Sequence, residues 1–281
     1  MAATSEAARS LRLYGAAVAR VLARARRRSG ADLEAATERP VFVLGSPRSG
    51  TSAVARSIGR LPGFADLGEL GPWKAAIPRL ATLPEEAAAA ELRRMLEAVR
   101  RFGLVRHLRA VEQSPETALV LGAAVRAYPQ AAVVHMVRDP RDVAASLIQK
   151  GWLRAGRAGR DDVGAPYGHH PRFWVEPERA AEFDEASEAR RAGWTWRAYV
   201  TGARASPVNT LEVPYEALAA DPATAAEALA AHIGADPVAL GRALGGFHAE
   251  SVGRWRRNLT PDQVDEVEAE AGELMQELGY S

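Results

Sequence analysis

The chain has 281 residues and a formal net charge of +1, so its length suits one large α/β domain and its charge does not indicate bulk nucleic-acid binding. It has no cysteine, which excludes disulfides, thiol nucleophiles and cysteine-ligated zinc. The sequence has no apolar run of transmembrane length and no signal peptide, so we expect a cytoplasmic protein, and the high alanine and arginine content suggests a bacterial source.

A basic amphipathic helix is predicted over residues 6–28. Its apolar residues on or near one face are Leu11, Val18, Val21 and Leu22, and its second half carries Arg20, Arg24, Arg26, Arg27 and Arg28. One interpretation packs the helix on the domain with the arginines near its negative end, and the other places it on a membrane surface or in a dimer contact. Residues 1–39 form a helical extension in this prediction, and residues 40–281 form the core of a single domain.

Residues 41–60 are predicted to form a strand, a glycine-bounded loop and a helix. The apolar run 41–44 leads into Gly-Ser-Pro-Arg-Ser-Gly-Thr-Ser at residues 45–52, and a helical pattern follows. Such a segment directs backbone N–H groups and a helix N-terminus at a phosphate. The loop differs from a Walker loop, because Thr51 occupies the lysine position and Arg48 is the loop's cation. This difference disfavours ATP or GTP as the ligand.

The next elements are a strand over residues 64–70 that contains Glu69, a helical stretch, a strand at 108–111 and a helix at 116–128. The apolar residues of the helical stretch, which we expect to wall an acceptor site, are Trp73, Leu92, Met95, Leu96 and Val99. A buried strand is predicted at 132–137. Arg138 follows it, and Asp139 and Pro140 then begin a helix that carries Ser146 and Lys150 on one face.

Residues 151–177 are rich in glycine, proline and arginine, which predicts a lid. Its aromatic and histidine residues include His169, His170, Phe173 and Trp174. Further helices are predicted at 178–203, 221–234 and 261–279, and a short strand from Asn209 precedes the pair Tyr215–Glu216. Strands that alternate with helices indicate a three-layer α/β P-loop fold, with a central parallel sheet flanked by helices and ligands at the carboxyl edge of the strands.

Four motifs occur in the same order as in sulfotransferases that use 3′-phosphoadenosine 5′-phosphosulfate (PAPS): the loop at 45–52, Arg138 with Ser146, Tyr215–Glu216, and the basic stretch 251–257. The chain resembles the bacterial, tyrosylprotein and carbohydrate branches of that family. The resemblance implies PAPS as co-substrate. It also implies that the residues around the nucleotide are Arg48, Ser49, Gly50, Thr51, Ser52, Arg138, Ser146, Lys150, Tyr215, Ser251, Arg254 and Trp255. Of these, Arg138, Ser146 and Lys150 would contact the 3′-phosphate.

Glu69 is the predicted catalytic base, because tyrosylprotein-type relatives carry a catalytic glutamate at the corresponding place and a strand-end carboxylate can accept a hydroxyl proton. Arg48 is the predicted catalytic cation at the leaving phosphate. His135 is a weaker candidate for the base, since its position in an apolar strand indicates a core histidine. Many relatives have a lysine where this chain has Gln113. Lys150 or an arginine of the lid could supply the missing charge.

The sequence therefore predicts a PAPS-dependent sulfotransferase that acts, without a metal, on a hydroxyl of a small-molecule, glycan or glycolipid acceptor. Aromatic residues that indicate either a hydrophobic acceptor pocket or a core are Trp73, Trp152, Phe173, Trp174, Trp194 and Trp196. One alternative is a P-loop kinase or nucleotide phosphotransferase, which a dependence on ATP and Mg²⁺ would favour. The other is a PAPS-binding protein without turnover, which Gln113 favours.

Overall fold

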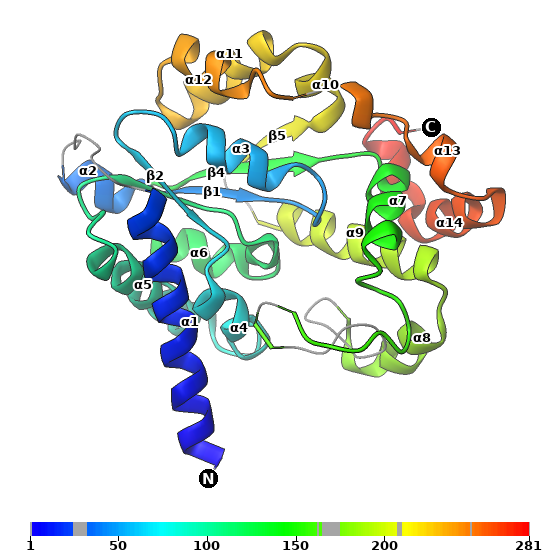
Figure 1. Cartoon of the computed structure of the whole chain (residues 1–281), viewed down its shortest axis with the longest axis horizontal. Helices are drawn as coiled ribbons and strands as arrows, with labels where there is room; N and C mark the ends of the chain where they lie inside the picture. The colour runs from blue at the N-terminus through cyan, green and yellow to red at the C-terminus, as the bar shows by residue number, and fades with distance from the viewer. Residues whose placement is uncertain are drawn as a thin grey trace.

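In the computed structural model, five parallel strands form one sheet in the order β2-β3-β1-β4-β5 (Figure 1). The strands are β1 (Val41–Leu44), β2 (Phe64–Gly68), β3 (Arg109–Glu112), β4 (Ala132–Val137) and β5 (Thr210–Pro214). The structure describes residues 2–24, 33–161, 163–164, 175–206, 210–247 and 249–280. Because all five strands run the same way, their carboxyl ends share one edge, where Leu44 of β1 pairs with His135 of β4.

Helices cover both faces of the sheet, which confirms the predicted three-layer α/β fold (Figure 1). The helices on one face are α3 (Thr51–Ile58), α11 (Pro222–Ile233) and α12 (Pro237–Leu244). The helices on the other face include α4 (Gly71–Leu80), α5 (Glu85–Phe102), α6 (Leu121–Ala127) and α9 (Glu188–Arg204). Successive residues of β1 alternate between the two cores, Val41 and Val43 in one and Phe42 and Leu44 in the other, as expected of a strand covered on both sides.

The remaining helices surround these layers or lie at the carboxyl edge. They are α1 (Ala2–Arg24), α2 (Leu33–Glu38), α7 (Pro140–Lys150), α8 (Ala180–Glu185), α10 (Tyr215–Ala220), α13 (Trp255–Asn258) and α14 (Pro261–Glu277). Short 3₁₀ turns are η1 (Pro115–Val120), η2 (Pro177–Arg179) and η3 (Ala249–Ser251). The long helix α14 begins with a capping box: Thr260 Oγ1 accepts from Gln263 N, and the Gln263 side chain accepts from Thr260 N.

The strand predictions are confirmed to within one or two residues, and two helix predictions are corrected. Residues 116–128 are not one helix, because the segment begins as η1 and becomes α-helical only in α6. Residues 178–203 are broken at Ala186, which has extended backbone angles, and Ser187 begins α9 by accepting a hydrogen bond from Arg190 N. A serine inside a helical pattern can begin a new helix as well as continue one.

The stretch after Glu69 is two helices, α4 and α5, and the prediction that its apolar residues wall an acceptor site is wrong for most of them. Trp73, Leu92, Leu96 and Val99 are fully buried in the core, where they cover the sheet. The core interpretation also holds for the tryptophans of α9. These side chains are Trp194 and Trp196, both at most 1% exposed. Phe173, Trp174, His169 and His170 lie outside the described residues.

The N-terminal helix α1 packs on β2, α4 and α5 (Figure 1). Val21 is buried, but Leu11 is 75% exposed and so does not belong to the packed face. Arg20 Nη1 donates to Glu69 O at 2.6 Å and Arg24 Nη1 pairs with Asp66 at 2.7 Å, so these arginines bind the domain. Arg26, Arg27 and Arg28 lie outside the described residues, and a membrane or dimer contact stays a prediction. No helix in the described part of the chain is long and apolar enough to cross a bilayer.

Candidate functional site

The loop between β1 and α3 has the backbone of a phosphate-binding loop. Gly45 has φ 145°, and a Cβ there would lie 2.2 Å from Met136 O, so only glycine lets the loop pass this close to β4. Gly50 has φ 92° and is the N-cap of α3. Arg48 also has a positive φ, 77°, an uncommon conformation for a residue with a side chain and one that occurs at ligand sites. The first turn of α3 leaves backbone N–H groups without intrahelical acceptors at this point.

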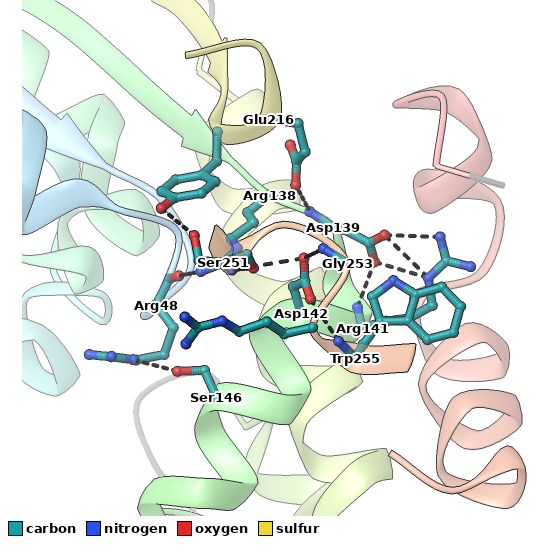
Figure 2. Close-up of polar contacts among 12 residues, drawn as sticks. Arg48, Arg138, Asp139, Arg141, Asp142, Ser146, Glu216, Ser251, Gly253 and Trp255 are labelled. Carbon is teal, nitrogen blue, oxygen red and sulfur yellow. Dashed lines mark hydrogen bonds and ion pairs between the residues drawn. The ribbon is translucent and has the colours of Figure 1, made fainter. Parts of the chain in front are cut away.

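Arg138 lies beside this loop, at the end of the neighbouring strand (Figure 2). Its Nη1 donates to Arg48 O at 3.1 Å and its Nη2 to Ser251 O, and its guanidinium lies 4.4 Å from the centre of the Tyr215 ring. Asp142 is 3.8 Å away, but Arg138 is only 8% exposed, so this is not a surface ion pair. Desolvation, followed by the charge of Arg138, lowers the pKa of Arg48. Two adjacent cations with incomplete hydration favour an anion between them.

Ser146 lies in the same cluster, two turns into α7. Its Oγ accepts from Arg48 Nε at 3.0 Å, so the loop's cation reaches across to the helix that follows Arg138 (Figure 2). The structure therefore brings together the two groups that the resemblance assigns to different phosphates. Lys150 lies farther along α7 and is exposed, and its carbonyl accepts from Arg157 Nη1 at 2.8 Å. A 3′-phosphate contact of Lys150 stays a prediction.

The basic stretch 251–257 is fastened to α7 by Asp142 (Figure 2). Asp142 Oδ2 accepts from Gly253 N at 2.7 Å and Oδ1 accepts from Trp255 N at 3.0 Å. Trp255 lies 4.3 Å from the Arg141 guanidinium, and its buried Nε1 has no hydrogen-bond partner in the described part of the chain. Arg254 donates to Glu250 O at the margin of the stretch. The basic stretch 251–257 thus lies over Arg138, and the Asp142 carboxylate, which the sequence did not indicate as a site residue, holds it there.

A hollow of about 340 Å³ opens beside the loop, between α3 and the segment that leads to residue 251. It is lined by Ala53, Arg56, Ser57, Arg60, Tyr215, Ala243, Gly246, Phe247, Glu250, Ser251 and Arg254. The Tyr215 ring packs 5.8 Å from Phe247, and its hydroxyl is 2.6 Å from Ser251 Oγ. Three arginines and two aromatic rings make this hollow suitable for a flat ring that carries negative charge. Phe247 was not singled out in the sequence, because no local pattern surrounds it.

Glu69 lies directly after β2 at the same edge of the sheet. Its Oε2 is 2.8 Å from Lys74 Nζ, and its side chain remains 29% exposed, so it is paired yet reachable from solvent. Gln113, at the position where relatives have lysine, is buried, and its Oε1 accepts from Ser52 Oγ at 3.0 Å. In a Walker loop the corresponding hydroxyl binds Mg²⁺, whereas here it is bonded to an amide.

His135 is a core residue, as interpreted from the sequence. It is fully buried, and its Nδ1 lies 3.2 Å from Oε2 of Glu212, a residue of the neighbouring edge strand β5. The Arg204 guanidinium, which also bonds Glu212, and His135 together lower the pKa of Glu212 to about 2. His135 therefore belongs to a structural cluster with Glu212 and Arg204.

Glu112 is a fully buried carboxyl below the site, and desolvation raises its pKa to about 7 despite hydrogen bonds from Ser114 and Thr117. Because the folded protein binds this proton more tightly than the unfolded chain, stability is retained below pH 4.5 and falls as the pH rises toward 7. The shift corresponds to about 3 kcal/mol. We expect the difference in unfolding free energy between Glu112→Gln and the unmutated protein to grow by this amount between pH 4.5 and 7.5 in urea titrations. A difference in unfolding free energy that stays constant over this pH range would contradict the raised pKa of Glu112.

Within the residues that the structure describes, no group of three His, Cys, Asp or Glu side chains has an arrangement that could hold a metal ion. The predicted absence of a metal from the reaction stays a prediction. Among the described residues, the cations at the site include Arg48 of the loop, Arg138 directly after β4, and the arginines that line the hollow described above.

Comparison with known proteins finds one matching family model. Residues 105–238 match the model of the sulfotransferase family, a segment that contains Gln113, Arg138, Ser146 and Tyr215. Over this segment the chain is similar to sulfotransferases. An uncharacterized protein from Aquifex aeolicus is 30% identical over 135 residues, which cover 41% of this chain but only 17% of that protein.

Solved sulfotransferases share the fold. Sulfotransferase STF1 from Mycobacterium tuberculosis H37Rv superimposes with a TM-score of 0.53 at 16% identity and covers 86% of this chain and 78% of its own. Mouse sulfotransferase SULT7A1, solved in complex with PAP, gives a TM-score of 0.52 at 19% identity over 85% of each chain. At these identities the likeness shows the fold alone. The loop at 45–52 and the segment 251–257 lie outside the part matched by the family model.

Proposed function

We propose that this protein is a sulfotransferase that moves a sulfuryl group from PAPS to a hydroxyl of a small-molecule, glycan or glycolipid acceptor. The observation that carries the proposal is the meeting of Arg48 and Arg138 at the carboxyl edge of two adjacent strands, one in a phosphate-binding loop and one at a strand end. A loop of this shape with arginine in place of the Walker lysine suits a 5′-phosphosulfate. The second arginine suits another anionic group of the same molecule.

The residues present fit PAPS in their chemistry. The loop N–H groups and Arg48 would bind the 5′-phosphosulfate, and Arg138 with Ser146 would bind the 3′-phosphate. The hollow lined by Tyr215 and Phe247 has the rings to accept the adenine. Two buried polar atoms support this fit, since Ser49 Oγ and Arg138 Nε have no hydrogen-bond partner among the described residues.

The proposed reaction needs three contributions from the protein. Glu69 accepts the proton of the acceptor hydroxyl, Arg48 and the loop amides stabilise the charge on the leaving phosphate, and the surrounding residues hold both partners in line. A new S–O bond forms to the acceptor as the S–O bond of PAPS breaks, and 3′-phosphoadenosine 5′-phosphate (PAP) leaves with the bonding electrons. Thr51 and the Ser52–Gln113 hydrogen bond make this loop a poor site for ATP with Mg²⁺.

The test compares three ligands by calorimetry: PAP, 5′-AMP, and ATP with Mg²⁺. We expect PAP to bind most tightly, because it alone among the three carries the 3′-phosphate for which Arg138 is placed. The loss of that phosphate in 5′-AMP should weaken binding by about 2 kcal/mol or more. Selective binding of ATP with Mg²⁺ would replace this proposal with a phosphotransferase function. Selective PAP binding without transfer to any hydroxyl acceptor would favour a protein that binds the nucleotide without turnover.

A further inference from the structure

The chain has 36 lysine and arginine residues, and only Lys74 and Lys150 among them are lysines. Lys150 is exposed at the end of α7, whereas Lys74 is 8% exposed and lies in the first turn of α4. A lysine is a compact point charge, while an arginine is a wide planar fork. A buried lysine in a chain that uses arginine almost everywhere therefore indicates a position where the shape of the cation matters.

Two carboxylates flank the Lys74 ammonium from different elements. Nζ lies 2.8 Å from Glu69 Oε2, just after β2, and 3.4 Å from Glu116 Oε1 in η1. Glu116 is 3% exposed, whereas the Glu69 side chain is 29% exposed. Lys74 thus joins an enclosed carboxylate to a carboxylate that reaches solvent at the edge of the sheet. A single ammonium can serve both oxygens because it donates in three directions.

The backbone at Glu69 is held from two further elements. Arg20 of α1 donates to Glu69 O at 2.6 Å, and Leu70 N donates to Ser114 Oγ at 3.1 Å. Ser114 in turn bonds to the buried carboxylate of Glu112. The main chain of Glu69 is therefore fixed from α1 and from the end of β3, and Lys74 contributes the restraint on its side chain.

We propose that Lys74 is a positioning residue that holds the Glu69 carboxylate in the orientation in which it accepts the acceptor's proton. This inference rests on the proposed sulfuryl transfer. The proton passes from the acceptor oxygen to Glu69 as the new S–O bond forms, and it leaves to water after the product departs. Glu116 orients Lys74 and Lys74 orients Glu69, so the three side chains act as one unit.

The first test replaces Lys74 with methionine, which keeps the length of the side chain and removes its charge. We expect kcat to fall about a hundredfold, because a misplaced base loses the aligned geometry, while KM for PAPS and the calorimetric affinity for PAP change less than about twofold. The matched control is Arg79→Met. Arg79 lies on the same helix as Lys74, and its carboxylate partner is Glu91. This control should leave kcat within about twofold of the unmutated enzyme.

A second variant separates positioning from stability. Lys74→Met strands the buried charge of Glu116 and should lower Tm, whereas Lys74→Met with Glu116→Gln removes that charge and should restore Tm. We expect kcat to stay low in the double variant. Lys74→Arg keeps the charge, and its kcat should be about tenfold higher than that of Lys74→Met. Recovery of kcat together with Tm in the double variant would overturn the proposal, as would a near-normal kcat in Lys74→Met.

A third measurement does not depend on turnover. Labelling with ¹⁵N-lysine gives two side-chain ammonium signals, one for each lysine of the chain. Glu69→Gln should shift the Lys74 signal. Glu91→Gln should not shift it, because Glu91 is paired with Arg79, the other cation of α4 in this comparison. An unmoved Lys74 signal in Glu69→Gln overturns the inference whatever the activity. Failure of the proposed function is distinguishable, because the protein would then lack both PAP binding and PAPS-dependent transfer while this signal still shifts.

Discussion

Replacing Glu69 with glutamine is expected to slow sulfuryl transfer in a single turnover about a hundredfold or more, because glutamine cannot accept the proton of the attacking hydroxyl. The side chain keeps its shape, and its position after β2 is held through main-chain contacts that the substitution leaves in place. The affinity for PAP should therefore be unchanged. Rapid-quench measurement with labelled PAPS reports the transfer step, and calorimetry reports the binding.

The control for this variant is Glu91→Gln. Glu91 is ion-paired with Arg79 of α4, as Glu69 is ion-paired with Lys74 of the same helix, but Glu91 lies within α5, whereas Glu69 directly follows β2. The Glu91→Gln variant should transfer the sulfuryl group at the rate of the unmutated enzyme. A Glu69→Gln protein that transfers as fast as this control would remove Glu69 from the role of base and direct the search to other carboxylates at the edge.

Replacing Arg138 with alanine should weaken PAP binding by about 2 kcal/mol or more, roughly a thirtyfold rise in the calorimetric Kd. The variant loses the charged hydrogen bonds proposed for the 3′-phosphate. It also frees Arg48 O and Ser251 O, the two carbonyls to which Arg138 donates, so the basic stretch 251–257 loses an anchor. Binding of 5′-AMP should change less than binding of PAP, since 5′-AMP lacks the 3′-phosphate.

The chain offers a close match as a control, Arg109→Ala. Arg109 is also 8% exposed, donates to two backbone carbonyls and lies over an aromatic ring, Phe64, at 4.7 Å. It begins β3 and so lies at the opposite end of the sheet from Arg138. Arg109→Ala should lower Tm comparably and leave PAP affinity intact. Equal losses of PAP affinity in both variants would mean that Arg138 acts through stability alone.

The parts of the fold that could be predicted from the sequence are those encoded locally. β4 is a continuous apolar run followed by a capping aspartate and a proline, and both its ends are found where expected. The break before α9 could not be predicted, because it depends on the backbone angles of Ala186 beside a serine that is compatible with a helix. The tryptophans of α4 and α9 were ambiguous for a similar reason, since periodicity does not separate a core face from a pocket wall.

Among the site residues, those in local motifs could likewise be predicted and those defined by remote partners could not. Arg48 and Arg138 stand in motifs with recognisable flanking residues, and the parallel order of β1 and β4 explains why they meet. Asp142 and Lys74 were missed as site residues because their partners are remote in sequence: Asp142 binds the backbone of residues 253 and 255, and Lys74 bridges Glu69 and Glu116. The scarcity of lysine in the chain was a signal that could have pointed to Lys74.

Asp142 accepts hydrogen bonds from the backbone N–H groups of residues 253 and 255, and these two bonds fasten the segment over Arg138. A ligand that reaches Arg138 through this segment must wait for those bonds to open. Its observed association rate then levels off at high concentration, at the opening rate of the segment. We expect the same fastening to slow the departure of a nucleotide bound beneath the segment, so that release of the spent nucleotide sets the pace of repeated turnover.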